Sequence, residues 1–223
     1  MIFRRRPAEE PVDSGVESTD EFDELEAERP RGPWDRSETT ADQDDDKYVD
    51  LGGLVIKGAE GFELRLQVDE ASQLVTAVLL AGPESGLELR AFAASRTGGI
   101  WDDIRTEMAA EVSRLGGTAT EVDGEFGTEL KLSVPLRTPD GRSATQLSRV
   151  VGVEGPRWLL RGTFLGRSAE EADPDGGIEG CFRDVIVVRG DQAMSPREMI
   201  PMTLPLAARA AAQEQEDDDR PES

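Results

Sequence analysis

The sequence contains no histidine and a single cysteine among its 223 residues. Without histidine, the chain lacks the commonest general base near neutral pH, the usual catalytic triads and the most frequent transition-metal ligand. The single cysteine, Cys181, forms no intrachain disulfide, which excludes the disulfide-rich scaffolds of small secreted proteins. Cys181 lies between Gly180 and Phe182, and this apolar setting indicates a core thiol rather than an activated nucleophile.

Long apolar runs are also missing. No stretch approaches the ~18 apolar residues of a membrane-spanning helix. Residues 1–7 carry three arginines, as the first part of a signal peptide would, but acidic residues follow instead of an apolar segment. With Ile2 and Phe3, these arginines would hold only weakly to an anionic membrane surface. We therefore expect a cytoplasmic protein without a membrane span.

Negative charge dominates the chain, and most of it lies at the two ends. The formal net charge is −22; residues 1–46 contain 16 acidic and 6 basic residues, and residues 207–223 contain 6 and 2. The apolar residues of these ends are few and scattered, so they cannot bury enough surface to offset the entropy of ordering. We predict disordered acidic tails at 1–46 and 207–223, on either side of a single domain at 47–206.

The acidic balance also bears on partners. A negative surface repels phosphate backbones, which disfavours direct binding of nucleic acid. The tails could attract a basic partner, occupy a nucleic-acid-binding groove by mimicry, or only keep the protein soluble. We expect a protein partner, whose identity the sequence does not give.

The middle of the chain has the patterns of strands and of one long helix. Residues 62–68 and 87–93 alternate between apolar and polar, residues 74–80 are more continuously apolar, and short turns join these three predicted strands. Five apolar residues at helical spacing then predict a helix, with Trp101 and Met108 buried against a sheet. The five are Trp101, Ile104, Met108, Val112 and Leu115.

Strand patterns return after this helix, over residues 118–123, 126–134, 146–153 and 157–165. A capping-box spacing at 168–171 and a helical turn near 178–182 precede a buried strand at 184–189 and an extended segment at 194–206. This order predicts an α+β fold, with one long helix on one face of an antiparallel sheet and a short second helix. It resembles Mog1/PsbP-like domains, a likeness that carries no function.

No motif predicts catalysis, a cofactor or a metal. The glycine pairs match neither a phosphate-binding loop nor a dinucleotide fingerprint. The acidic run at 42–46 fails the spacing of a calcium-binding loop. Asp102 and Asp103 lie side by side in the first turn of the predicted helix, where they complement its dipole and point about 100° apart. The pair Gly98-Gly99 before that helix favours a turn and cap over an anion site.

Two features are candidates for interaction. Trp34 and Asp35 end the motif Gly-Pro-Trp-Asp within the acidic tail, and a lone tryptophan there indicates docking, onto the domain or onto a partner. Arg149, Arg157 and Arg161 fall on adjacent predicted strands, and they are either ordinary surface residues or a basic patch. Arg157 and Arg161 share a face by parity and could receive Asp35. The candidate interaction residues are thus Trp34, Asp35, Arg157 and Arg161.

Several short motifs recur in an order typical of one family. They begin at Gly32 (GPWD), Asp50 (DLGGL), Gly61 (GFELR), Gly98 (GGIWD), Phe126 (FGTEL) and Gly155 (GPRWLLRG). With these motifs, residues 32–206 resemble a family of uncharacterised actinobacterial proteins, a domain of unknown function of the 3710 type. The resemblance implies one domain and a cytoplasmic location, and it supplies no activity, cofactor or catalytic residue.

Three functions remain open at this point. The absence of catalytic motifs and the acidic tails favour a non-catalytic protein-interaction or adaptor module. A carrier of a small apolar or anionic ligand, held between sheet and helix, is the alternative. An enzyme that uses only carboxylates and arginines comes third.

Overall fold

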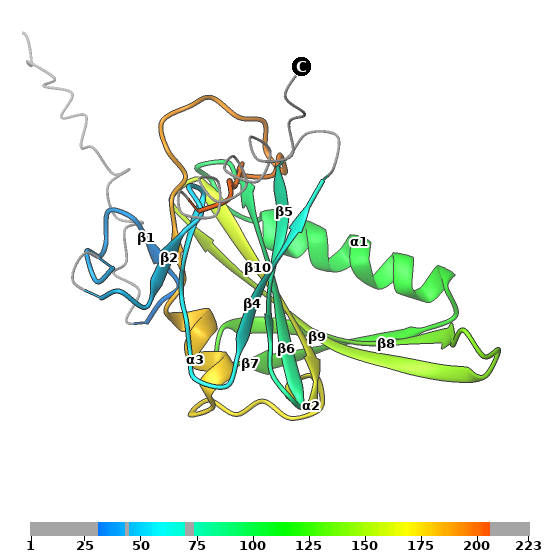
Figure 1. The fold of residues 1–223 in the computed structure, drawn as a ribbon. Helices are drawn as coiled ribbons and strands as arrows, with labels where there is room; N and C mark the ends of the chain where they lie inside the picture. The colour runs from blue at the N-terminus through cyan, green and yellow to red at the C-terminus, as the bar shows by residue number, and fades with distance from the viewer. Residues whose placement is uncertain (1–30, 43–44, 70–73, 206–223) are drawn as a thin grey trace, which may run out of the picture. The chain divides into compact units, whose positions relative to one another are not determined.

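The computed structural model describes residues 31–42, 45–69 and 74–205, and Figure 1 shows their arrangement. The larger sheet is antiparallel, in the order β4-β5-β6-β10-β9-β8-β7, and the smaller one has the order β1-β11-β3-β2. The strands of the larger sheet are β4 Glu63–Val68, β5 Val75–Ala81, β6 Ser85–Ala93, β7 Thr118–Gly124, β8 Gly127–Arg137, β9 Ser143–Gly155 and β10 Trp158–Gly166. Those of the smaller sheet are β1 Trp34–Asp35, β2 Tyr48–Asp50, β3 Leu54–Lys57 and β11 Ile186–Val187. The helices are α1 Ile100–Arg114, α2 Arg167–Glu170 and α3 Gly177–Arg183.

The predicted α+β class is confirmed, and the strands of the larger sheet lie close to the predicted ranges. Apolar residues of β6 alternate as the pattern requires, so that Leu87 and Leu89 are fully buried while Glu88 and Arg90 between them are half-buried on the opposite face. The sequence pattern predicts one sheet, whereas the described residues form two. The likeness of the strand and helix order to Mog1/PsbP-like domains stays a prediction.

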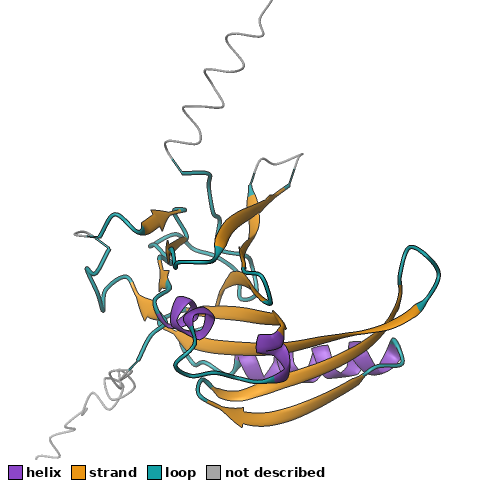
Figure 2. Cartoon of the chain, turned by 60° about the horizontal axis from the view of Figure 1, so that its bottom comes forward, coloured by secondary structure: helices purple, strands orange, loops and turns teal. Residues whose placement is uncertain are grey.

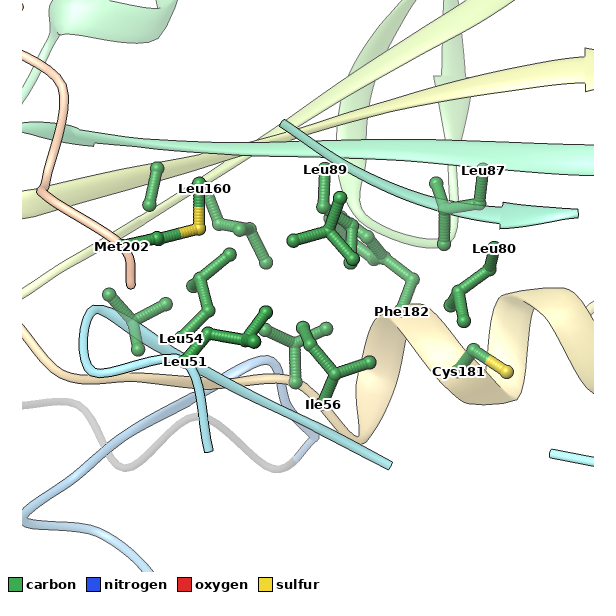
Figure 3. Packing of buried hydrophobic residues seen from close by; sticks show 14 of the residues in the cluster. Leu51, Leu54, Ile56, Leu80, Leu87, Leu89, Leu160, Cys181, Phe182 and Met202 are labelled. Carbon is green, nitrogen blue, oxygen red and sulfur yellow. The ribbon is translucent and has the colours of Figure 1, made fainter. Parts of the chain in front are cut away.

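Other elements pack on both faces of the larger sheet, and α1 covers only part of one face. On one face the smaller sheet and α3 pack against it, and Figure 3 shows Leu54 and Ile56 opposite Leu89 and Leu160, with Phe182 of α3 beside them. On the other face α1 lies over β7, β8 and β9, as the long helix in Figure 2 shows. The core therefore has two separate clusters, one on each side of a single sheet.

Helix α1 is held to the sheet by Trp101. The indole is buried, its Nε1 donates to the carbonyl of Thr128 at 2.9 Å, and the ring lies directly over Gly152 of β9, where a Cβ atom would find no room. Met108 is half-buried against the same cluster. Leu115, the last residue of the predicted stripe, is 56% exposed because the helix ends at Arg114.

The start of α1 is capped from a distance. No side chain next to the helix caps it, and the carboxylate of Glu154 on β9 accepts from the backbone N–H of Gly99 at 2.8 Å and of Trp101 at 2.6 Å. A carboxylate at a helix N-terminus also complements the helix dipole. The anion that binds at Gly98-Gly99 is therefore a side chain of this same chain.

The predicted boundary of the N-terminal tail at residue 46 differs from the structure. Residues 31–42 and 45–46 are part of the folded unit, and Gly32 and Pro33 are buried. The segment is ordered because its charges find partners within the chain: Arg36 forms two hydrogen bonds to Asp42, at 2.7 and 3.0 Å, and this contact holds the pKa of Asp42 below its usual range. The rest of the predicted tails, residues 1–30, 43–44 and 207–223, lies outside the described residues.

The segment after β11 is extended and packs on the domain, as predicted for residues 194–205. Met202 forms a bridge with Val75 of β5, and Met199 forms one with Phe92 of β6. Arg197 in the same segment pairs with Glu107 of α1 at 2.7 Å and with Asp103 at 3.3 Å. This segment thus links the larger sheet to the helix. None of the helices in the described part of the chain is both long and apolar enough to cross a membrane.

The contact between Gly152 and Trp101 gives a direct test of this packing. Gly152→Ala should destabilise the fold by about 1–3 kcal/mol, because the added methyl displaces a buried ring. Gly86→Ala on β6 is the matched control, since a Cβ there meets only ordinary contacts, the nearest at 3.6 Å, and the change should stay within about 0.5 kcal/mol. Urea unfolding of both variants measures the difference, and equal stabilities would show that Trp101 does not rest on Gly152.

Candidate interaction surface

The Gly-Pro-Trp-Asp motif docks onto its own domain. The backbone N–H of Trp34 donates to the carbonyl of Val185 at 2.8 Å, and that of Arg36 donates to Val187 at 3.0 Å. These bonds make β1 a parallel neighbour of β11, with Trp34 opposite Ile186. Trp34 is half-buried in this position. Of the two docking modes left open by the sequence, the structure shows the contact within the chain.

Asp35 connects the motif to the larger sheet. Its Oδ2 accepts from Nε1 of Trp158 at 2.7 Å, and Trp158 is fully buried at the start of β10. Its Oδ1 accepts from the backbone N–H of Ser37 at 2.9 Å and from the Ser37 hydroxyl at 2.6 Å. Asp35 is therefore committed to Trp158 and Ser37 rather than to Arg157 or Arg161, where the sequence analysis placed it.

Arg157 does not share a surface patch with Arg161. It lies in the turn between β9 and β10 with a φ angle of 61°, outside the alternation on which the parity argument depended. Its Nη2 donates to the carbonyl of Gly190 at 3.2 Å, and its own carbonyl accepts from the N–H of Ala94 at 2.8 Å. Arg157 therefore tethers the chain after β11.

Arg149 is not a surface residue either. Its side chain is 1% exposed and lies on the face of β9 that meets α2 and α3. It donates to Glu129 at 3.1 Å, to Glu179 at 2.6 Å and to the carbonyl of Ser168 at 2.9 Å, and its guanidinium lies 4.1 Å from the centroid of the Phe164 ring. Sequence reasoning missed this buried ionic cluster, because the local pattern does not show which face of β9 other elements cover.

Arg161 is the member of the predicted patch that stays on the sheet surface, with its side chain 20% exposed. Its guanidinium carbon lies 5.5 Å from the centroid of the Phe92 ring, and its Nη2 is 3.9 Å from Oε1 of Glu88. Arg90 takes the same oxygen at 2.8 Å, so two guanidinium groups share one carboxylate. Burial, and then the charge of Arg90, lower the pKa of Arg161 from its usual value. Nε of Arg161 has no hydrogen-bond acceptor among the described residues.

These side chains belong to the part of the sheet that extends past α1. The strand register places Arg65 beside Leu79, Leu79 beside Glu88, and Glu88 beside Thr163, with Arg90 opposite Arg161 in the next row. Helix α1 lies over β7 to β9, whereas Leu79, Glu88, Arg90 and Arg161 are half-buried and Arg65 is exposed. We call this surface the open face; its residues are Arg65, Leu79, Glu88, Arg90, Phe92, Arg161 and Thr163.

Other candidate groups have structural partners. Asp102 pairs with Arg105, and Asp103 with Arg197. Burial, followed by the charge of Asp184, raises the pKa of the Cys181 thiol from its usual value near 9 to about 11. In the described part of the chain, no group of three or more cysteine, aspartate or glutamate side chains is arranged to hold a metal ion.

One cavity lies away from the open face, next to α2 and α3. Its volume is about 600 Å³, and Phe62, Pro83 and Ile178 form the apolar part of its lining. Glu84, Arg167 and Asp173 are among the charged residues at its edge. The space between α1 and the sheet, in contrast, contains the packed ring of Trp101.

Comparison with known proteins identifies a family of unknown function. A family model described as a protein of unknown function (DUF3710) matches residues 32–211. The match begins at the Gly-Pro-Trp-Asp motif and covers the whole folded unit after Arg31. Among curated proteins, no significant match is found.

The bond between Asp35 and Trp158 should contribute measurably to stability. Asp35→Ala leaves the buried indole N–H without its acceptor, a loss of about 1–3 kcal/mol. Asp46→Ala is the control, because Asp46 is exposed in the same part of the chain. Chemical denaturation followed by tryptophan fluorescence measures both variants. If Asp35→Ala were as stable as Asp46→Ala, the motif would not anchor the segment.

The raised pKa of Cys181 has a consequence for stability at high pH. Because the folded state holds this proton more tightly than the unfolded state, its contribution to stability should be lost as the pH rises from about 9 through about 11. Cys181→Ala should therefore show a shallower decline of the melting temperature over this range than the unchanged protein. Identical declines would mean that the thiol titrates equally in both states.

Proposed function

We propose that this chain, a member of the DUF3710 family of proteins of unknown function, is a non-catalytic cytoplasmic module that binds a protein partner through the open face. The observation that carries the proposal is the pair Arg90 and Arg161, which share the single carboxylate of Glu88 on a half-exposed sheet face. The pair retains about one unit of positive charge in a chain whose formal net charge is −22.

The physical reason lies in the burial of Arg161. A guanidinium that is partly removed from water needs anionic or polar acceptors to replace its hydration. Glu88 supplies one oxygen at 3.9 Å, which Arg90 also binds, and the Arg161 side chain keeps 20% of its surface exposed. Arginine beside an aromatic ring is also common in the anchors of protein interfaces. Acceptors on a partner would complete this arrangement.

The positions of the acidic side chains support a non-catalytic role. A carboxylate that acts as a general base needs an accessible oxygen near the substrate. Glu154 instead caps α1, and Glu129 and Glu179 are 2% exposed and paired with Arg149. Each of these carboxylates has a structural partner, so an enzyme built on carboxylates and arginines has little support in the described residues.

A ligand carrier is the second candidate, and the cavity near α2 and α3 favours it. Its volume of about 600 Å³ falls in the range of small-molecule sites. The site would differ from the one expected between sheet and helix, because Trp101 fills that space. A small molecule in the cavity would meet Phe62 and Ile178 on one side and charged residues at the edge.

Affinity purification from the native cell tests the interaction module. The full chain should recover a protein partner, and the double variant Arg90→Gln and Arg161→Gln should lose it. Arg137→Gln, on an exposed position of β8, is the control and should retain it. Thermal melts verify that all the chains are folded. A partner recovered equally by every variant would refute the open face as its site, and small molecules recovered without a protein would favour the carrier.

A further inference from the structure

The arginine pair of the open face has the chemistry of a carboxylate site. The side chains of Arg161 and Arg90 are 20% and 28% exposed, and both lie against the same Oε1 of Glu88, at 3.9 and 2.8 Å. Guanidinium groups bind carboxylates through parallel N–H donors, so one further carboxylate would restore charge balance between Arg90, Arg161 and Glu88. Glu63 is bound by Arg65 at 2.7 Å on the neighbouring edge strand and is thus already engaged.

We propose that the carboxylates of residues 214–219 bind at Arg90 and Arg161. We call this segment the run. This inference rests on the proposed function, because a bound run would compete with the protein partner for the open face. The run contains two glutamates and three aspartates, Glu214, Glu216, Asp217, Asp218 and Asp219.

Charge favours this run over a free acidic molecule. A separate anion approaches a chain with a formal net charge of −22 and is repelled by it, more strongly at low salt. Residues 214–219 are covalently attached, so no long-range approach is needed. Attachment through a short linker gives an effective concentration in the millimolar range, which suffices for a weak charge contact.

The length of the chain allows the contact. The backbone N–H of Ile200 donates to the carbonyl of Ala91, next to Arg90, at 3.0 Å. With a strand rise of about 3.3 Å per residue, Pro205, five residues after Ile200, lies within about 25 Å of Arg90. Eight residues lie between Pro205 and Glu214, and the extended chain from one to the other covers about 30 Å.

Paramagnetic broadening in the full chain tests the contact. Gln215→Cys places a thiol within the run without removing an acid, and Cys181 is buried with a raised pKa, so a nitroxide reagent should label only the new site. Amide signals of β6 and β10 around Arg90 and Arg161 should broaden. The broadening should be lost in the Arg90→Gln and Arg161→Gln variant and when the five acids become amides, and it should persist in Arg137→Gln.

Three results would overturn the inference. The first is the absence of broadening on β6 and β10 in the labelled full chain. The second is broadening that survives the conversion of the five acids to amides, which would show an apolar contact. The third is broadening that survives in the Arg90→Gln and Arg161→Gln variant, which would place the contact away from the two arginines.

Partner capture separates this inference from the proposed function. With the five acids converted to amides, the chain should recover several-fold more of the partner, because the competing run no longer occupies the arginines. If the broadening is absent but capture of the partner still depends on Arg90 and Arg161, the internal contact is refuted and the proposed function stands. Broadening without any partner that depends on the two arginines would refute the interaction module and leave the internal contact in place.

Discussion

The hydrogen bond from the indole of Trp158 to Asp35 joins the two sheets. Trp158 is fully buried at the start of β10, so its N–H needs an acceptor inside the protein. Asp35 provides that acceptor only when β1 pairs with β11, and this pairing positions the smaller sheet over one face of the larger one. The motifs Gly-Pro-Trp-Asp and Gly-Pro-Arg-Trp are thus two halves of one contact.

The sequence predicts those elements whose pattern repeats several times. In the strands of the larger sheet and in the helix from Ile100, apolar residues recur over stretches long enough to show the period of each element. The strands β1 and β11 are two residues long, and β1 is held by partners more than a hundred residues away, which no local pattern encodes. Charge was misleading at residues 31–42, because Arg36 and Asp42 pair with each other in the folded chain.

The candidate site was predicted only in part, and the three arginines show why. Arg149, Arg157 and Arg161 are alike in sequence terms, with apolar neighbours on predicted strands. The fold buries Arg149 between two glutamates, ties Arg157 to a backbone carbonyl and leaves Arg161 half-covered beside Arg90. The difference depends on whether α1, α3 or water covers each strand face, and this is decided by tertiary packing alone.

The pairing of Trp34 with Ile186 has a consequence for synthesis on the ribosome. The Gly-Pro-Trp-Asp segment emerges early, but its parallel neighbour β11 follows about 150 residues later. Until then Trp34 lacks its strand partner, and a cell that adds about 5–20 residues per second exposes it for many seconds. Contacts of such high sequence separation also fold slowly. The nascent chain therefore presents Trp34 to chaperones and to neighbouring chains until β11 has been made.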